Sequence, residues 1–491
     1  MSRPPIVGVT GGIAGTAATY AAVQALVDRL DTAGDRLRDW AVADEKVLAD
    51  PDLLESAVLS PLTFADAEGR VLAAAGGVHG AVRSSLECET DALLVRGTVA
   101  AFEGCDRLVA DSLRALGHAV CFDIGYAVSS AAPCLLALGV VAVPAVSLTR
   151  DHLPADVRSR LDGETQAIGR AEGETPEEWL DKHPAVTQHV ADGSGGLLDG
   201  LIAGAPLLPA LAPLVGLRPF HATTADAASD LAAFYQPEGP PHVRRRADLS
   251  VPLGDRPPGD LAGLILHLAQ TNDLSAPDRP ADQGTVEVQT LHEEDGSVRH
   301  IVYLPGTDDM ATTPFSQDSD ARDLAADLHV IAGEDTTYAR GIEQVMADAG
   351  IGSHDPVLLV GHSLGGMEAA SLLAHGSGFH VTHVVTAGAP IGGIHGYPAG
   401  SHVLSLENRG DVVPLLDGAD NTDSVSQVTV RFDDHQTSVG ANHHLAHYVR
   451  GAAAVDASND PSVREQRASL HDHGFLGGSG TATSQVFQIT R

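Results

Sequence analysis

One short stretch of the chain constrains the fold more than any other. Residues 356–366 read Pro-Val-Leu-Leu-Val-Gly-His-Ser-Leu-Gly-Gly, and a helix-forming run follows over residues 367–374. Apolar residues after a proline predict a short buried strand, so the stretch predicts a strand, a tight turn and a helix. The turn places Ser363 between Gly361 and Gly365, where a side chain at either glycine would collide with neighbouring backbone. This arrangement is typical of a nucleophile elbow, which exposes a serine hydroxyl near a helix N-terminus.

Length and composition limit the classes of protein to which this chain can belong. A chain of 491 residues with 43% hydrophobic residues can form two or three domains with large cores. Only 4% of residues are aromatic and 52 are glycine, so we expect a core of small side chains and closely approaching helices. The formal charge of −35 argues against nucleic-acid binding and against electrostatic docking on anionic lipid.

The N-terminal part of the chain, residues 1–220, is predicted to be largely α-helical. Apolar residues recur at steps of three and four over residues 17–49, from about residue 61 to residue 86, and over residues 93–116. Long helices with short connections predict antiparallel hairpins or a bundle. The hairpins loosely resemble those of WXG100-type secretion substrates, but Trp40 is followed by Ala-Val where that family has x-Gly. Residues 1–16 lack the pattern of a signal peptide, so we expect a cytoplasmic protein, or one exported without a standard signal peptide.

Two uncharged or nearly uncharged segments, residues 126–148 and 195–217, have two interpretations. They could contact a membrane, or they could be proline-kinked helices buried against the N-terminal helices. Residues 221–283 are rich in proline and predict a linker zone. The four cysteines lie between residues 88 and 134 at spacings that fit no zinc site. We expect buried thiols, or one or two disulfides if the protein is exported, and we expect no metal or cofactor.

The pattern changes to alternating strands and helices over residues 284–455. Strands are predicted over residues 285–291, 298–304, 357–360, 381–390, 403–406 and 425–432, and a helix over residues 336–349. Such alternation predicts an α/β domain whose mostly parallel sheet is covered by helices on both faces. Residues 456–491 form a tail that could add an edge strand to the sheet.

A serine nucleophile requires a general base and a carboxylate that orients the base. Asp411 follows the strand over residues 403–406 and is the preferred carboxylate; the alternatives are Glu407, Asp417 and Asp434. The base should come last in the chain, at the start of a helix. Residues 441–448 offer His443, His444 and His447, of which His443 and then His444 are favoured because they precede the helix.

An oxyanion hole completes such a site with two backbone N–H groups. One should come from Leu364, the residue after the nucleophile, and the other from the loop after an early strand. That loop reads Pro-Gly-Thr-Asp-Asp over residues 305–309 and favours Thr307, with Asp308 as the alternative.

Taken together, these motifs resemble the α/β-hydrolase superfamily. Residues 361–366 and 411–414 are similar to the class 3 lipase pattern, although the His-x-x-Tyr spacing of that class is missing. Residues 303–307 and 385–390 resemble actinobacterial lipase- and esterase-like hydrolases that carry a helical N-terminal region. The resemblance implies hydrolysis of small-molecule or lipid carboxylic esters. The alternatives are a thioesterase or acyltransferase with the same triad, or a secretion-linked protein that binds a membrane or a partner and carries an auxiliary hydrolase fold.

Overall fold

The computed structural model describes residues 3–131, 193–204, 216–218, 220–275, 282–293, 296–310, 312, 314, 316–435, 439–478 and 480–491. These divide into two compact units: Met1–Gly15 with Leu113–Arg491, and Thr16–Ser112. Much of both apolar segments, residues 132–148 and 205–215, lies outside the described residues. Within the described residues, no helix has the length and apolar character needed to cross a membrane.

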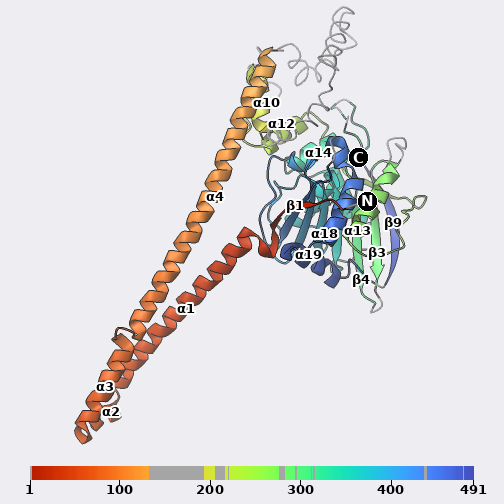
Figure 1. The fold of residues 1–491 in the computed structure, drawn as a ribbon. Helices are drawn as coiled ribbons and strands as arrows, with labels where there is room; N and C mark the ends of the chain where they lie inside the picture. Colours follow the sequence, from red (N-terminus) through yellow and green to blue (C-terminus); the bar gives the residue numbers. More distant parts are fainter. Residues whose placement is uncertain are drawn as a thin grey trace, which may run out of the picture. The chain divides into compact units, whose positions relative to one another are not determined.

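A single mixed sheet organises the larger unit (Figure 1). Its nine described strands run in the order β1-β8-β7-β6-β5-β4-β3-β9-β2. Strands β4 to β8 pair in parallel in the middle of the sheet, and the outer pairings are antiparallel. The predicted mostly parallel sheet is therefore correct for the middle of the sheet only. The strands are β1 (Ile6–Gly11), β2 (His242–Arg245), β3 (Thr285–His292), β4 (Val298–Leu304), β5 (Val357–His362), β6 (Val381–Ala387), β7 (His402–Asn408), β8 (Gln427–Phe432) and β9 (Thr481–Thr490).

The described helices lie in both units. Those of Thr16–Ser112 are α1 (Thr16–Leu48), α2 (Pro51–Leu59), α3 (Pro61–Gly76) and the first part of α4 (Ala81–Ala131). The others are α10 (Ser194–Gly204), α12 (Thr224–Ala232), α13 (Leu261–Asn272), α14 (Leu324–Ile331), α15 (Thr337–Asp348), α16 (Leu364–His375), α17 (Val439–His443), α18 (Leu445–Asp456) and α19 (Pro461–Asp472). Three short 3-10 helices, η1 (Gly12–Ala14), η5 (Asp273–Ser275) and η7 (Val413–Leu415), join these elements.

Helices cover both faces of the sheet, and the alternation of side chains along the strands explains why. On β5, Val357 and Leu359 pack into one core with α14, α15 and α16. Leu358 and Val360 of the same strand pack into a second core with α13, α18 and α19. Successive side chains of a strand point to opposite faces, so a strand buried on both faces reads as a continuous apolar run. The predicted α/β architecture is thus confirmed in this coarse form.

Both ends of the larger unit's chain enter the sheet in ways that the sequence analysis did not predict. Residues 6–11, which fall in the region predicted to be largely α-helical, form β1 and pair with β8. The tail supplies β9, which is not an edge strand because it pairs with β3 on one side and β2 on the other. The edge strand β2 comes from the proline-rich zone. Local alternation predicts a strand but not its neighbours, because strand pairing depends on distant residues.

The smaller unit is a helical hairpin. The helix predicted over residues 17–49 is confirmed as α1, whereas the second predicted run ends at Gly76 and a new helix begins at Ala81. Arg96 of α4 forms ion pairs with Asp28 and Asp31 of α1.

The described cysteines differ in how far they are buried. Cys121 is buried as expected, but Cys105 is exposed and Cys88 is partly exposed, so the prediction of buried thiols is wrong for these two. Cys134 lies outside the described residues.

Close helix packing in the larger unit depends on glycine at particular positions. A Cβ at Gly451 of α18 would lie 2.3 Å from the ring of Phe432 on β8. A Cβ at Gly341 of α15 would lie 2.3 Å from the side chain of Ile489 on β9. Both distances are far below van der Waals contact, so these helices approach the sheet only because the glycines have no side chain. This agrees with the small-residue core expected from composition.

We predict that Gly451→Ala destabilises the protein although alanine is the better helix former. Alanine gains about 1 kcal/mol in helix propensity, but the methyl group overpacks the contact with Phe432 at a cost of about 1–3 kcal/mol or more. Denaturant unfolding of the larger unit measures the difference. Gly97→Ala in α4 is the comparison variant in the smaller unit: no atom of a neighbouring segment lies within 4 Å of its added Cβ, so it should not lower the unfolding free energy of that unit. Equal behaviour of the two variants would contradict the packing argument.

Candidate active site

The predicted site residues gather at the carboxyl ends of the central parallel strands. The loop over residues 305–307 follows β4, Ser363 follows β5, and Asp411 lies three residues after the end of β7. Carboxyl ends of parallel strands meet at one edge of a sheet, which is where open α/β sheets bind ligands. The topology therefore brings together residues that are more than one hundred positions apart.

Ser363 occupies a strained turn between β5 and α16. Its backbone has φ 50° and ψ −123°, a conformation that non-glycine residues rarely adopt. A Cβ at Gly361 would lie 2.2 Å from the carbonyl oxygen of Gly365, and one at Gly365 would lie 2.0 Å from that of Leu304. Both flanking glycines are thus required by close backbone contacts, as the motif predicts. The serine lies at the N-terminus of α16 and is 9% exposed.

Asp411 and His443 are directly hydrogen-bonded. The Nδ1–H of His443 donates to Asp411 Oδ2 at 2.7 Å, and the buried carboxylate also accepts the hydroxyl of Tyr448 at 2.6 Å. Its other oxygen accepts the backbone N–H of Val413 at 2.9 Å. The bond to Asp411 places the proton of a neutral His443 on Nδ1, which leaves Nε2 as the basic nitrogen.

His362, which lies inside the serine motif, contacts both the backbone and the ring of His443. Its Nε2–H donates to the carbonyl oxygen of His443 at 2.9 Å, and the two rings stack with centroids 4.4 Å apart. Burial keeps the pKa of His362 well below 6.5, so this ring stays neutral. Because His362 directly precedes Ser363, these contacts place His443 beside the serine turn.

The other two candidate histidines have different partners. His444 is the N-cap of α18, where its Nδ1 accepts the backbone N–H of Ala446 at 3.2 Å. His447 forms an ion pair with Asp434. Neither is bonded to Asp411, so the geometry selects His443 from the three alternatives.

The alternative carboxylates are also engaged elsewhere. Glu407 pairs with Arg431 at 2.8 Å, and Asp417 accepts the backbone N–H of Gly393 at 2.8 Å. Asp434 is held by His447 and Arg450. Among the described residues, no group of three or more His, Cys, Asp or Glu side chains could hold a metal ion.

Among the backbone N–H groups near Ser363 that have no acceptor in the described part of the chain, two lie at the positions predicted for an oxyanion hole. They belong to Leu364, the first residue of α16, and to Thr307 in the loop after β4. That loop touches the serine turn, because a Cβ at Gly306 would lie 3.0 Å from the Cβ of Ser363. The backbone N–H of Asp308, the alternative to Thr307, instead donates to the carbonyl oxygen of Arg322 at 2.8 Å. The unsatisfied pair of donors is what an oxyanion hole requires.

A second buried carboxyl group, Asp327 of α14, lies close to this loop. Its Oδ2 accepts the hydroxyl of Thr307 at 2.8 Å. Burial raises the pKa of Asp327 to about 7, with Asp323 raising it further and the Thr307 hydrogen bond and His443 opposing the shift. The hydrogen bond fixes the side chain of Thr307 beside the candidate oxyanion hole.

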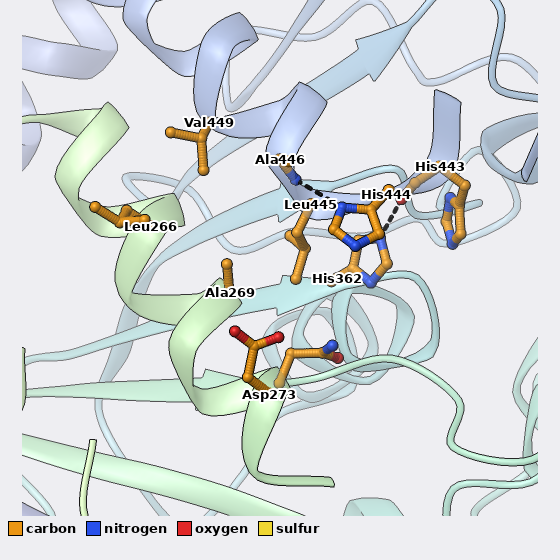
Figure 2. A pocket seen from close by; sticks show the side chains of 10 residues that line it. Leu266, Ala269, Asp273, His362, His443, His444, Leu445, Ala446 and Val449 are labelled. Atoms are coloured by element: carbon orange, nitrogen blue, oxygen red, sulfur yellow. Dashed lines mark hydrogen bonds between the residues drawn. The ribbon is translucent and has the colours of Figure 1, made fainter. Parts of the chain in front are cut away.

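A groove of about 460 Å³ opens beside His362 and His443, between α13 and α18. Figure 2 shows Leu266 and Ala269 coming from α13 and Ala446 and Val449 from α18. These side chains make the walls apolar, and Asp273 adds a carboxylate at the end of α13. A groove of this size falls in the range of small-molecule sites, about 300–1,000 Å³.

Sequence reasoning missed four residues that the geometry assigns to the site. His362 and Tyr448 lie inside quoted motifs but carry no local signal for a role. Asp327 is an acidic residue within the apolar run of α14, a helix that the sequence analysis did not predict. An acidic residue in an apolar helix indicates a buried carboxyl group that has a hydrogen-bond partner. Arg322 stands in an acidic loop with no distinguishing pattern.

We predict that Asp327→Asn removes a pH dependence of stability. The carboxyl pKa is about 7 in the folded chain against 3.8 when unfolded, so its stabilising contribution is full below pH 3.8 and is lost as the pH rises to 7. The unfolding free energy of Asp327→Asn relative to the unchanged protein should therefore increase by up to about 4 kcal/mol between pH 4 and pH 8. A difference that is the same at both pH values would show that this carboxyl group does not titrate as described.

Comparisons with protein-family models, with curated proteins and with solved structures find no match to this chain.

Proposed function

We propose that the chain is a serine hydrolase that cleaves carboxylic esters through an acyl-enzyme. Ser363 is the nucleophile, His443 the general base and acid, and Asp411 the carboxylate that orients the base. The N–H groups of Leu364 and Thr307 form the oxyanion hole. The order Ser, Asp, His along the chain supports the proposal, because it is the order that α/β hydrolases use.

The observation that carries the proposal is the conformation of Ser363. A non-glycine residue held at φ 50° costs about 1–3 kcal/mol, and glycine would relieve that strain. A turn with only a structural role gains nothing from a serine here. A serine is needed here if its hydroxyl group acts as the nucleophile beside the hydrogen-bonded His443–Asp411 pair.

In the acylation step, the Oγ of Ser363 attacks the ester carbonyl carbon while its proton moves to Nε2 of His443. The negative charge that develops on the carbonyl oxygen is stabilised by the two free N–H groups, each worth about 3 kcal/mol in the transition state. The imidazolium is stabilised by Asp411. The ester C–O bond then breaks, and the departing alcohol takes the proton from His443.

Deacylation repeats these steps with water as the nucleophile. His443 removes a proton from water, the oxygen of water attacks the acyl carbon, and the same N–H groups stabilise the second oxyanion. Collapse of this intermediate breaks the bond to Oγ of Ser363, which recovers its proton from His443. The carboxylic acid leaves, and the free enzyme is restored.

The groove between α13 and α18 supports an ester with an apolar chain as the substrate. Side chains of leucine, alanine and valine line it, together with His362 and His443. The formal charge of −35 also disfavours the approach of anionic esters at low salt. Neutral esters of short and medium chain length are therefore the class to test first.

We predict that a fluorophosphonate probe labels the protein and that Ser363→Ala abolishes the labelling. The probe reacts with serines activated by a neighbouring base, so labelling reports the nucleophile independently of substrate choice. Turnover of p-nitrophenyl esters of increasing chain length then ranks substrates. Ser371→Ala, a serine on the same helix that is hydrogen-bonded to His375, is the matched control and should label fully.

The role of Asp411 has its own expected result. Asp411→Asn should lower kcat by several orders of magnitude, about 10⁴-fold in the serine-protease precedent, because the wrong tautomer of His443 is then favoured. Absence of both labelling and ester turnover in the folded protein, with detergent or lipid present, would overturn the proposed function.

A further inference from the structure

A fully buried arginine lies behind the candidate oxyanion hole. Arg322, in the loop before α14, is 0% exposed. Its Nη1 donates to the carbonyl oxygen of Gly306 at 2.9 Å, and its Nη2 donates to Asp308 Oδ2 at 2.6 Å and to Ser275 Oγ at 2.8 Å. A buried guanidinium group is costly unless it is paired and hydrogen-bonded. Nε of Arg322 has no partner among the described residues, so the bonds of the two Nη atoms to Gly306, Asp308 and Ser275 offset that cost.

The bond to Gly306 determines which way the next N–H group points. In a planar trans peptide the C=O and N–H groups point in opposite directions. With its C=O turned toward Arg322, the Gly306–Thr307 peptide must direct the N–H of Thr307 away from the arginine. That N–H is the donor that has no acceptor within the described residues.

Further contacts keep this peptide from rotating. The backbone N–H of Asp308 donates to the carbonyl oxygen of Arg322 at 2.8 Å, and Asp308 also accepts the backbone N–H of Gly284 at 2.7 Å. On the other side of the peptide, the hydroxyl of Thr307 is bonded to Asp327. The loop is thus bonded to the start of β3, to α14 and to the loop that carries Arg322.

The geometry points to Arg322 as a positioning residue that holds the oxyanion hole preformed in the free enzyme. This inference rests on the proposed function, and it adds a residue that no local motif identifies. A donor fixed before the substrate binds needs no reorganisation when the negative charge develops, which is where such donors gain most of their effect. The planar fork of arginine can reach the carbonyl oxygen and the carboxylate together, whereas the single ammonium group of lysine cannot match that geometry.

The test is Arg322→Lys, assayed on soluble short-chain esters. We expect kcat to fall by about 10- to 100-fold, somewhat less than the loss of a whole oxyanion donor, while KM stays within about twofold because ground-state binding does not use the hole. The rate of fluorophosphonate labelling should fall by a similar factor. Affinity for a trifluoromethyl ketone, which forms an oxyanion on Ser363, should weaken with kcat/KM.

Arg491→Lys is the matched control. Arg491 is a partly buried arginine whose side chain is 11% exposed; it is bonded to Asp323 and Glu238, but it has no contact with the loop over residues 305–308 among the described interactions. The two variants should lose comparable stability, and only Arg322→Lys should lose kcat. A merely structural role would lower the yield of folded protein and leave the kcat of the folded fraction unchanged.

Asp308→Asn tests the positioning role if Arg322→Lys does not fold. It weakens the hydrogen bond between Arg322 and residue 308 and leaves the arginine in place. Its kcat should fall less than that of the lysine variant, again with KM nearly unchanged. A folded Arg322→Lys or Asp308→Asn variant with the kcat of the unchanged enzyme overturns the positioning role alone. An unchanged protein that neither labels nor hydrolyses esters overturns the proposed function, and the positioning role with it.

Discussion

The strained turn at Ser363 is the constraint on which the candidate site depends. A serine at φ 50° persists only where the surrounding structure holds it, and the backbone around it packs so closely that a Cβ at Gly361 or at Gly365 would collide with a carbonyl oxygen. The turn is therefore supported by β4 and β5 of the sheet and by α16. Because the parallel strands end at one edge, the same sheet places Asp411 and His443 next to this turn.

Buried polar groups around the turn form two sets with different tasks. One set surrounds the proposed base: Asp411 and His362 bind His443 at its side chain and its backbone, and Tyr448 donates to the same carboxylate of Asp411. The other set fixes the loop after β4 through Arg322 and Asp327. Burial is costly for each of these groups, and the hydrogen bonds offset that cost while allowing one geometry only. Hydrogen bonds thus hold both His443 and the loop after β4, which are the proposed base and part of the proposed oxyanion hole.

Much of this organisation is predictable from sequence. Most of the features that sequence does not predict depend on contacts between residues that are distant along the chain. The elbow, α1, α15 and the central strands follow from apolar periodicity and glycine placement, as do Ser363, Asp411 and a histidine near residue 443. Strand β1 was missed because its two glycines weaken the strand pattern, and β9 was misplaced because pairing partners are set by the whole sheet. Arg322 and Tyr448 act through residues far away in sequence, so no local pattern identifies them. The choice among His443, His444 and His447 likewise required three-dimensional contacts.

The most direct test of the account is a crystal structure of the protein after reaction with a phosphonate ester. The account predicts one covalent adduct on Oγ of Ser363, with a phosphonate oxygen about 2.7–3.1 Å from the N–H groups of both Leu364 and Thr307. The loop over residues 305–308 should keep the position that it has beside Arg322 in the free protein. An adduct on another residue would contradict the assignment of the nucleophile. An adduct on Ser363 whose oxygen meets neither N–H group would contradict the oxyanion hole.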